Sequence, residues 1–491
     1  MRQEVFRMER VTYLDKGSKQ IEDFNLQIYR GEIMGMIPIS AHGLQALLQL
    51  MQTNMPLYDG HVYYCGERVN SWKSTRRSVN RIGVIDAHSR LVEHMTVSDN
   101  IFVLRQGFRQ NMIKNRLLQR QLAPFMQDIG VQIPADAYVD KLSAFERVTV
   151  ELLRAVVAGY RLIVLHEIGT VINGSELGKL YEIMHHYAGQ GFSFLYISLH
   201  LEEIMEVCDR VALFSNGRIQ KVVGRAEMKS EIVQSYTIEF DKMIRCHMGQ
   251  RSAVGKDKKA VLSLSHISGE VLTDFTMEVY EGECLVVQNL DEQVLRDILS
   301  VLCGDRKPKE GKLCMEGRAI HPPSCKDFAL IAADPTKTMV FQGMSYLDNL
   351  CMGLSRRVPG IWKNNSMKNS VIKEYAESLG EDVFAMPVEA LGEKQKYQLV
   401  YTRVLLQKPK VVVCVQPFRG ADLTHRVFIW KMMEMLLDKG MAVVVLTINL
   451  ADSMSLADRL IRVGKEGTVQ EVEKGEFGML SVAAPWMDLY R

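Results

Sequence analysis

The two halves of this chain repeat one another at an offset of 249 to 251 residues. The matched segments keep small clusters of charged or polar residues in the same order. They are Arg30-Gly31-Glu32 with Glu281-Gly282-Glu283, Asp99-Asn100 with Asp348-Asn349, and Cys208-Asp209-Arg210 with Ala457-Asp458-Arg459. Solenoid repeats span only about 20 to 50 residues, so a period this long indicates duplication of a whole domain.

Each half alternates short apolar runs with amphipathic segments, which is the pattern of an α/β domain. Continuous apolar runs at 162–165 and 411–414 predict one central parallel strand in each half. Each sheet is expected to be mixed and to be accompanied by a helical subdomain, near 98–160 in the first half and 345–408 in the second.

We expect the first domain over 1–244, a linker over 245–259 and the second domain over 260–491. The linker segment is polar and basic, contains two glycines and has no periodic pattern. Its lysines and arginines could contact an anionic lipid or a nucleic acid, but a solvated connector is the simpler interpretation.

Composition excludes several classes of protein. A net charge of +2 does not fit a dedicated nucleic-acid binder. The first ten residues are too charged for a secretory signal, and the apolar runs are far shorter than the 18 or so residues that cross a bilayer. We therefore predict a cytoplasmic protein that is at most peripheral to the inner face of the plasma membrane. The 9 cysteines show no zinc-site spacing, so we predict reduced thiols and no metal.

Two stretches carry a resemblance to a known family. One is Ile197-Ser198-Leu199-His200-Leu201-Glu202-Glu203-Ile204 followed by Cys208-Asp209-Arg210-Val211, and the other runs from Pro409-Lys410-Val411 to Gly420-Ala421-Asp422. Their order and spacing resemble ATP-binding cassette proteins. More narrowly, they resemble the tandem ATPase subunit of bacterial ribose/galactose-type sugar importers. The resemblance implies two P-loop NTPase-like nucleotide-binding domains that pack on each other, Mg-ATP as cofactor, and a membrane permease as partner.

The residues at the family's phosphate-binding loop depart from its G-x4-G-K-[ST] pattern. Such a loop holds phosphates with backbone N–H groups, a lysine, and a hydroxyl that binds Mg²⁺. In the first half Pro38 and Gly43 stand at the two glycines, Leu44 at the lysine and Gln45 at the hydroxyl. The second half places Asn289 at the first glycine and Leu295 at the lysine, and Arg296 follows one position later.

The other positions that the resemblance marks as nucleotide-binding also differ from the family. Ala87 replaces the glutamine that senses the γ-phosphate, Ser143 begins a signature motif that reads Leu-Ser-Ala-Phe-Glu, and His166 replaces the aspartate that holds magnesium. The switch histidine is Leu199. The catalytic glutamate is retained as Glu167 and is Gln416 in the second half.

Glu167 without these partners is interpreted as a remnant, since phosphoryl transfer depends on positioning and charge neutralisation. A metal held by His42, His88 and His166 is an alternative use of the same edge.

The lost phosphate contacts decide the functional prediction. A hydrogen bond to a charged group contributes about 1.5 to 3 kcal/mol, so losing the lysine, the hydroxyl and several amides removes about 5 kcal/mol or more. Millimolar affinity corresponds to only about 4 kcal/mol. We therefore predict a degenerate pseudo-ATPase that needs no cofactor and serves as a regulatory subunit docked on an integral membrane protein.

The segment SRLVEHMTVSDNIF keeps the family's docking pattern and supplies Val92, Glu93 and Asp99 as docking residues. Two alternatives stay open. One is an ATPase that energises monosaccharide import with unorthodox phosphate binding, and the other is a soluble regulator that binds another small molecule in the old cleft.

Overall fold

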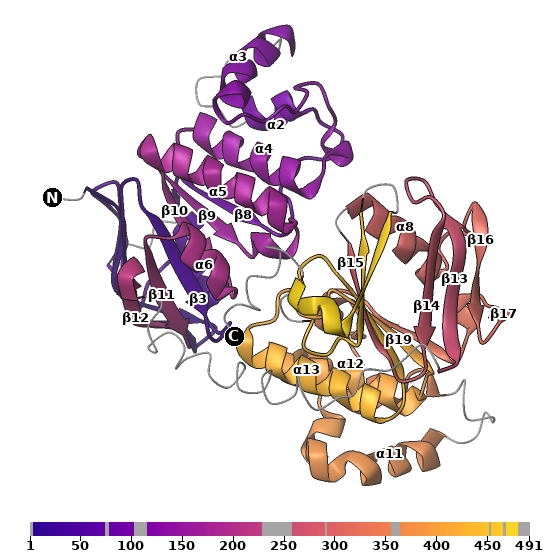
Figure 1. Ribbon diagram of the computed structural model, residues 1–491. Coiled ribbons are helices and arrows are strands. Elements are labelled where there is room, and N and C mark those ends of the chain that lie inside the picture. Colours follow the sequence, from indigo (N-terminus) through magenta and orange to yellow (C-terminus); the bar gives the residue numbers. More distant parts are fainter. Residues whose placement is uncertain are drawn as a thin grey trace. The chain divides into compact units, whose positions relative to one another are not determined.

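The protein is described by a computed structural model, which places residues 3–73, 78–102, 115–227, 258–289, 292–354, 364–450, 453–464 and 468–479 (Figure 1). The chain divides into two compact units, with the bulk of the first before Asp241 and the bulk of the second after it. The predicted linker 245–259 lies outside the described residues except for its last two positions. Its bounds and those of the two domains stay a prediction.

The first unit contains a sheet that is parallel apart from its last strand. Within the described residues the strand order is β12-β11-β3-β10-β9-β8. The bounds are β3 Ile33–Pro38, β8 Ile82–Asp86, β9 Leu162–His166, β10 Ser193–Ile197, β11 Arg210–Ser215 and β12 Arg218–Gly224. Strand β9 pairs in parallel with both β10 and β8, which confirms the central strand predicted from its apolar run.

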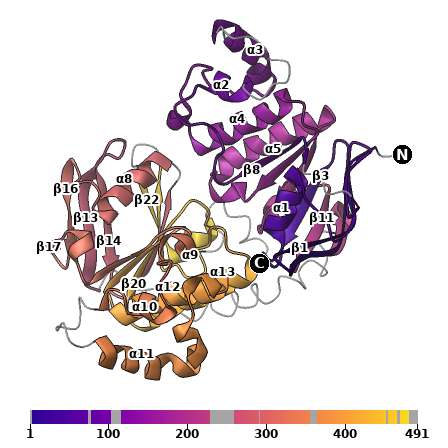
Figure 2. The same cartoon turned by 180° about the vertical axis from the view of Figure 1, so that it is seen from behind.

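A second, antiparallel sheet and two sets of helices complete the first unit (Figure 2). Its strands are β1 Glu4–Asp15, β2 Ser18–Tyr29, β5 Asp59–Tyr64 and β6 Glu67–Ser71, and β4 Thr53–Asn54 pairs separately with β7 Ser78–Val79. The helices are α1 Leu44–Gln52, α2 Val97–Phe102, α3 Asn115–Asp128, α4 Ala144–Val157, α5 Gly174–Gly189 and α6 Leu201–Val207. Helices α2, α3 and α4 form the predicted helical subdomain.

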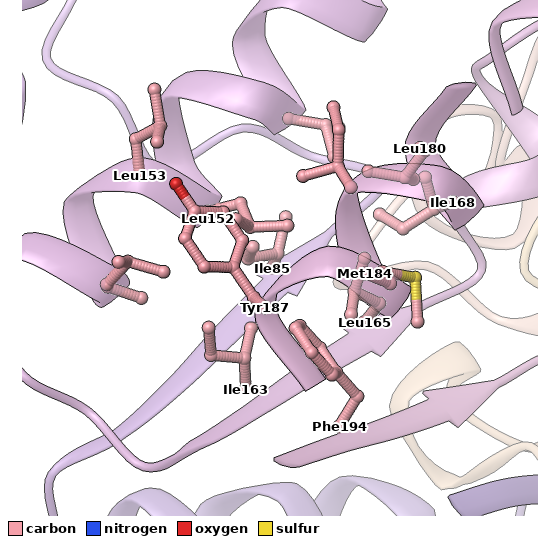
Figure 3. Packing of buried hydrophobic residues seen from close by; sticks show 14 of the residues in the cluster. Ile85, Leu152, Leu153, Ile163, Leu165, Ile168, Leu180, Met184, Tyr187 and Phe194 are labelled. Atoms are coloured by element: carbon pink, nitrogen blue, oxygen red, sulfur yellow. The ribbon is translucent and has the colours of Figure 1, made fainter. Parts of the chain in front are cut away.

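Two apolar cores lie on opposite faces of the parallel sheet, and β9 contributes to both. Ile163 and Leu165 belong to the core formed with α4 and α5, where Met184 and Phe194 also pack (Figure 3). Leu162 and Val164 belong to the core formed with α1 and the antiparallel sheet. Because both faces of the strand are covered, its sequence is apolar throughout rather than alternating.

The second unit repeats this arrangement. Its described strands follow the orders β18-β19-β20-β15-β21-β22 and β14-β13-β16-β17. The strand bounds are β13 Ala260–Ser268, β14 Phe275–Tyr280, β15 Cys284–Asn289, β16 Glu310–Met315, β17 Arg318–Ala319, β18 Phe328–Ile331, β19 Val411–Val415, β20 Ala442–Thr447, β21 Arg459–Val463 and β22 Val469–Glu473. Strand β19 lies between β18 and β20, as its apolar run predicted.

The helices of the second half complete the repeated pattern. They are α8 Glu292–Cys303, α9 Pro335–Thr338, α10 Tyr346–Cys351, α11 Asn364–Leu379, α12 Glu393–Gln407 and α13 Leu423–Asp438. No helix in the part of either unit that the structure places has the length and apolar character needed to cross a membrane.

The segments that repeat in the sequence make the same contacts in both units. Arg210 Nε donates to Glu32 Oε1 at 2.6 Å, and Arg459 Nε donates to Glu283 Oε1 at 2.7 Å. Each of these arginines also lies 5.2 Å from the ring centroid of a tyrosine, Tyr29 or Tyr280. The duplicated charges are therefore ion pairs in both units, each with a buried carboxylate; the arginine is buried in the second unit and partly exposed in the first.

Candidate functional site

The loop between β3 and α1 is the first place where a phosphate-binding loop is expected. Three of its N–H groups have acceptors within the unit. Ile39 N donates to Phe214 O at 2.8 Å, His42 N to Ser40 Oγ at 3.3 Å and Leu44 N to Ala41 O at 3.0 Å. Amides bound in this way do not point together at an anion, which is what a phosphate-binding loop requires.

The backbone conformation and the close packing of Gly43 require glycine at this position, without any ligand. Gly43 immediately precedes α1 with φ 86, where side chains are disfavoured. A Cβ at this position would lie 2.2 Å from Gln20 O and 3.0 Å from Gly217 Cα. Close packing of the loop against β2 and the β11–β12 turn thus accounts for this residue.

Leu44, the residue at the lysine position, is turned into the protein. It is only 6% exposed and belongs to the core shared by α1 and the antiparallel sheet, whereas Gln45 is exposed. Pro38 is the last, buried residue of β3. The helix begins with an apolar residue because its inner face forms part of that core.

The corresponding place in the second unit shows the same burial. Strand β15 ends at Asn289, residues 290–291 lie outside the described part, and α8 begins at Glu292. Leu295 is 6% exposed and packs in the core of the second unit, and Arg296 next to it is exposed. Both lysine positions are therefore leucines with buried side chains.

Glu167 and Gln416 follow β9 and β19 in the same backbone conformation. Their φ angles are 55 and 42. Glu167 N donates to Ile197 O at 2.9 Å and Gln416 N donates to Leu446 O at 2.8 Å. Both side chains are buried, and Gln416 Oε1 accepts a hydrogen bond from Arg419 Nη1 at 3.1 Å. The left-handed turn is thus kept in both units, whether or not the side chain is acidic.

His166, before Glu167, makes an ion pair across the sheet. Its Nδ1 lies 3.6 Å from Asp86 Oδ2 at the end of β8. Burial lowers the pKa of His166, but Asp86 and the charge of Glu167 outweigh it, so the pKa is raised. Burial in turn raises the pKa of Asp86, and His166 more than reverses this, so that pKa is lowered. A positively charged imidazole is therefore stabilised at the position of the magnesium-holding aspartate.

The alternative metal site is not assembled. Among the residues that the structure describes, no three or more His, Cys, Asp or Glu side chains group as metal ligands. His42 Nε2 is instead 3.0 Å from Lys19 O. His42 therefore contacts β2, whereas His166 contacts Asp86, and the two histidines do not share a partner.

The remaining nucleotide positions have local structural roles or face partly outward. Ser143 caps α4, since its Oγ accepts from Glu146 N at 3.2 Å and Ser143 N donates to Glu146 Oε2 at 2.9 Å. Ala87 follows β8 and Leu199 follows β10, each half-buried. The Ser-x-x-Glu spacing of Ser143 and Glu146 predicts this capping role. The family resemblance had instead indicated Ser143 as a nucleotide-binding position.

The predicted docking residues lie between β8 and α2. Val92 is 51% exposed, and Asn100 fixes its backbone by accepting from Val92 N at 2.8 Å and donating to Val92 O at 3.1 Å. Glu93 is exposed. Asp99 accepts from Thr96 Oγ1 at 2.6 Å within the first turn of α2. Val92 and Glu93 are thus held outward on a fixed loop, and Asp99 stabilises the helix beside them.

The same surface recurs in the second unit. Phe341 is 46% exposed, and Asn349 accepts from its N at 2.8 Å and donates to its O at 3.0 Å. The repeated asparagine therefore fixes the backbone of an exposed apolar residue, Val92 or Phe341, on each unit.

A cavity of about 300 Å³ in the first unit is lined by Arg90, two residues before Val92. Its walls are the end of α1, strands β7 and β8, and helix α4, and its polar lining includes Asn80, Arg90, Glu151 and Arg154. Glu151 Oε1 accepts from Ser89 Oγ at 2.7 Å and from Arg90 N at 2.8 Å, and Arg154 Nη2 lies 3.5 Å from its other oxygen. Burial raises the pKa of Glu151. Sequence reasoning missed this pair, whose signal is its i, i+3 spacing on a helix.

Comparison with known proteins shows which proteins this chain is similar to. The sequence model of the ABC transporter family matches residues 21–168. A ribose import ATP-binding protein of Rhizobium johnstonii is 23% identical over 96% of this chain and 94% of its own length. A xylose import ATP-binding protein of Geobacillus kaustophilus is 23% identical over 97% and 96%. The galactofuranose transporter ATP-binding protein of Escherichia coli K12 is 20% identical over 98% of each chain.

One solved structure resembles the chain across both units. It is a chain from ribosome-bound archaeal Pelota and ABCE1, with a TM-score of 0.64 and 13% identity, and the match covers 96% of this chain and 79% of that one. At this identity the likeness concerns the fold alone. The repeated sheets and these matches show a fold of two tandem ATP-binding-cassette-type domains, and the chain is similar along nearly its whole length to ATP-binding proteins of ribose, xylose and galactofuranose import.

Proposed function

We propose that this chain is a two-cassette subunit that does not hydrolyse ATP and that acts by docking on an integral membrane protein, as a regulatory subunit. The observation that carries the first part is the pair Leu44 and Leu295. Each stands where a cassette places its phosphate-binding lysine, and each is 6% exposed in an apolar core. Neither side chain can neutralise a phosphate.

Backbone geometry supports the same proposal. The N–H groups of Ile39, His42 and Leu44 are engaged inside the first unit. To bind a triphosphate, the loop would have to break these hydrogen bonds, each worth about 0.5 to 1.5 kcal/mol net. No lysine would compensate at Leu44. Mg-ATP therefore does not fit the residues present, and no catalytic step through it is derived.

The features that do survive have structural explanations. Gly43 packs against Gln20 O, and Ser143 caps α4. Glu167 occupies a turn that the second unit builds with Gln416. These three residues therefore do not by themselves indicate that the protein binds or hydrolyses a nucleotide.

One observation favours the alternative that the chain energises monosaccharide import as an ATPase. Glu167 lies buried at the end of a central strand, where a general base belongs. Under this alternative the cofactor is Mg-ATP and Glu167 is the catalytic residue.

Addition of Mg-ATP is expected to leave the melting temperature unchanged. A cassette with ligand at about a hundred times its Kd gains about 2.7 kcal/mol, which corresponds to about 5 to 10 °C for a unit of this size. Thermal-shift and calorimetric titration with millimolar Mg-ATP measure this directly. Phosphate release should stay at background in the wild type and in Glu167→Gln. Turnover that Glu167→Gln abolishes would instead establish the ATPase.

The docking part rests on Val92 and on the cavity lined by Arg90. An apolar side chain held outward by two hydrogen bonds from Asn100 is already fixed in place before a partner binds. The cavity of about 300 Å³ that Arg90 lines, two residues before Val92, offers a place for a protruding side chain of the partner. The names of the relatives describe import proteins, which supports a permease-like integral membrane partner.

Substitution of this surface should weaken capture of the partner without unfolding the protein. Val92→Asp places a charge on the exposed apolar residue, and Glu93→Lys reverses the neighbouring charge. We expect about a tenfold or greater loss for Val92→Asp, since a buried interface anchor contributes about 2 kcal/mol. The measurement is recovery of integral membrane proteins from detergent-solubilised membranes on immobilised protein.

The matched control is Val222→Asp, the same change at a valine of β12 that is 40% exposed in the same unit. It should leave capture intact, and all three variants should keep the wild-type melting temperature. Equal capture by Val92→Asp and wild type would remove the docking proposal.

A further inference from the structure

An arginine recurs beneath both exposed apolar residues. Arg154 on α4 and Arg403 on α12 are 249 residues apart, as are Val92 and Phe341. Arg154 Nη1 donates to Arg90 O at 3.2 Å, and Arg403 Nη2 donates to Met339 O at 2.7 Å. Each carbonyl belongs to the second residue before the exposed apolar one, so the two guanidinium groups occupy equivalent places.

The charges around these two arginines differ. In the first unit Arg154 lies 3.5 Å from the carboxylate of Glu151, one helical turn earlier. Val400 stands at the corresponding position in the second unit. Arg403 is 6% exposed, and its Nη1 is buried with no acceptor within hydrogen-bonding distance among the residues that the structure describes. Burial lowers the pKa of Arg403.

The contacts of Arg403 compensate only part of this burial. Its Cζ lies 5.8 Å from the ring centroid of Phe341, near the outer limit of a cation–π contact. Its Nη2 donates a hydrogen bond to one backbone carbonyl, that of Met339. A buried guanidinium with no counter-charge is unfavourable, and a carboxylate is the group whose geometry matches its remaining donor.

We infer that Arg403 receives a carboxylate from the docking partner, an Asp or Glu presented beside an apolar residue that packs on Phe341. This inference rests on the proposed docking function and specifies its partner in the second unit. In this inference the exposed ring of Phe341, whose backbone Asn349 holds, moves aside to admit the carboxylate. The first unit, where Glu151 already neutralises Arg154, takes a segment without that acid.

The inference is tested with fragments that imitate the two halves of such a segment. The probes are 3-phenylpropionate, which carries a ring and a carboxylate, and 3-phenylpropanamide, which has the same shape without the charge. Ligand-observed NMR titration of the full chain measures their binding. We expect the acid to bind about tenfold or more tightly than the amide, because a charge-assisted hydrogen bond separates them.

Arg403→Met should abolish the preference for the acid. It should also keep or raise the melting temperature, since it removes an unpaired buried charge. The matched control is Lys394→Met on the same helix, which removes a lysine 5.5 Å from the ring centroid of Phe428. Binding of the acid should survive that change.

Absence of binding by the acid, equal binding of the amide, or an acid preference that survives Arg403→Met would each overturn the assignment. The assay contains neither nucleotide nor membrane, so such a failure leaves the proposed docking function untouched. Failure of the proposed function would appear as ATP turnover, or as unchanged membrane-protein capture by Val92→Asp, and neither can arise from the fragments.

Discussion

Replacing Arg459 by Met is expected to lower the free energy of unfolding by about 3 to 5 kcal/mol, because it leaves a buried carboxylate without its cation. The side chain of Glu283 is 0% exposed. It accepts from Arg459 Nε at 2.7 Å and Nη2 at 3.2 Å, and its second oxygen also accepts from Tyr280 N at 2.8 Å. Equilibrium unfolding in urea measures the loss.

The double variant Arg459→Met/Glu283→Leu serves as its control. When both charges are removed, an apolar pair of similar volume should recover most of the loss. If the double variant is as unstable as the single one, the destabilisation comes from packing and the stranded charge is not its cause. The pair has a counterpart in the first unit, Glu32–Arg210, so the same experiment applies there.

Gly43→Ala is expected to destabilise the protein by about 3 kcal/mol in the absence of any nucleotide. A left-handed backbone costs a non-glycine residue about 1 to 2 kcal/mol, and a forced contact adds about 1 to 3 kcal/mol. At φ 86, the new methyl group would lie 2.2 Å from Gln20 O. Thermal and urea unfolding of the unliganded protein give the value.

Gly66→Ala is the matched control. Gly66 has φ 83 in the turn between β5 and β6, and a Cβ there meets nothing within 4 Å. It should cost only the backbone share, about 1 to 2 kcal/mol. Equal losses at the two positions would mean that the contact with Gln20 does not constrain Gly43. The difference between the two losses of unfolding free energy measures the cost of the contact with Gln20 O, which requires glycine at position 43 even when no phosphate is bound.

The central parallel strand of each unit follows from local pattern. Apolar runs at 162–165 and 411–414 became β9 and β19, each paired on both sides. Such runs are visible because a strand covered on both faces has no polar positions to interrupt it. The helical subdomains were likewise predicted within the ranges that contain α4 and α12.

The candidate site was predicted as positions in a motif, and the chain alone does not say what those positions do. Leu44 and Leu295 were identified as replacements for lysine, and the structure adds that both side chains are buried in cores. Asp99 was predicted to dock a partner, and the structure adds that it accepts a hydrogen bond inside its own helix turn. The roles of Asn100 and Asn349 were not recognised, because each holds a loop residue eight positions earlier.

The sequence by itself determined the duplication, the class of each unit and the identity of every residue at the nucleotide positions, because these are properties of spacing and residue type. Only the tertiary structure decided which groups surround the buried guanidinium of Arg403. Arg403 meets Met339 and Phe341, which lie more than 60 positions away. Whether a charge is paired depends on which distant groups the fold brings within a few ångströms, and no local pattern contains that distance.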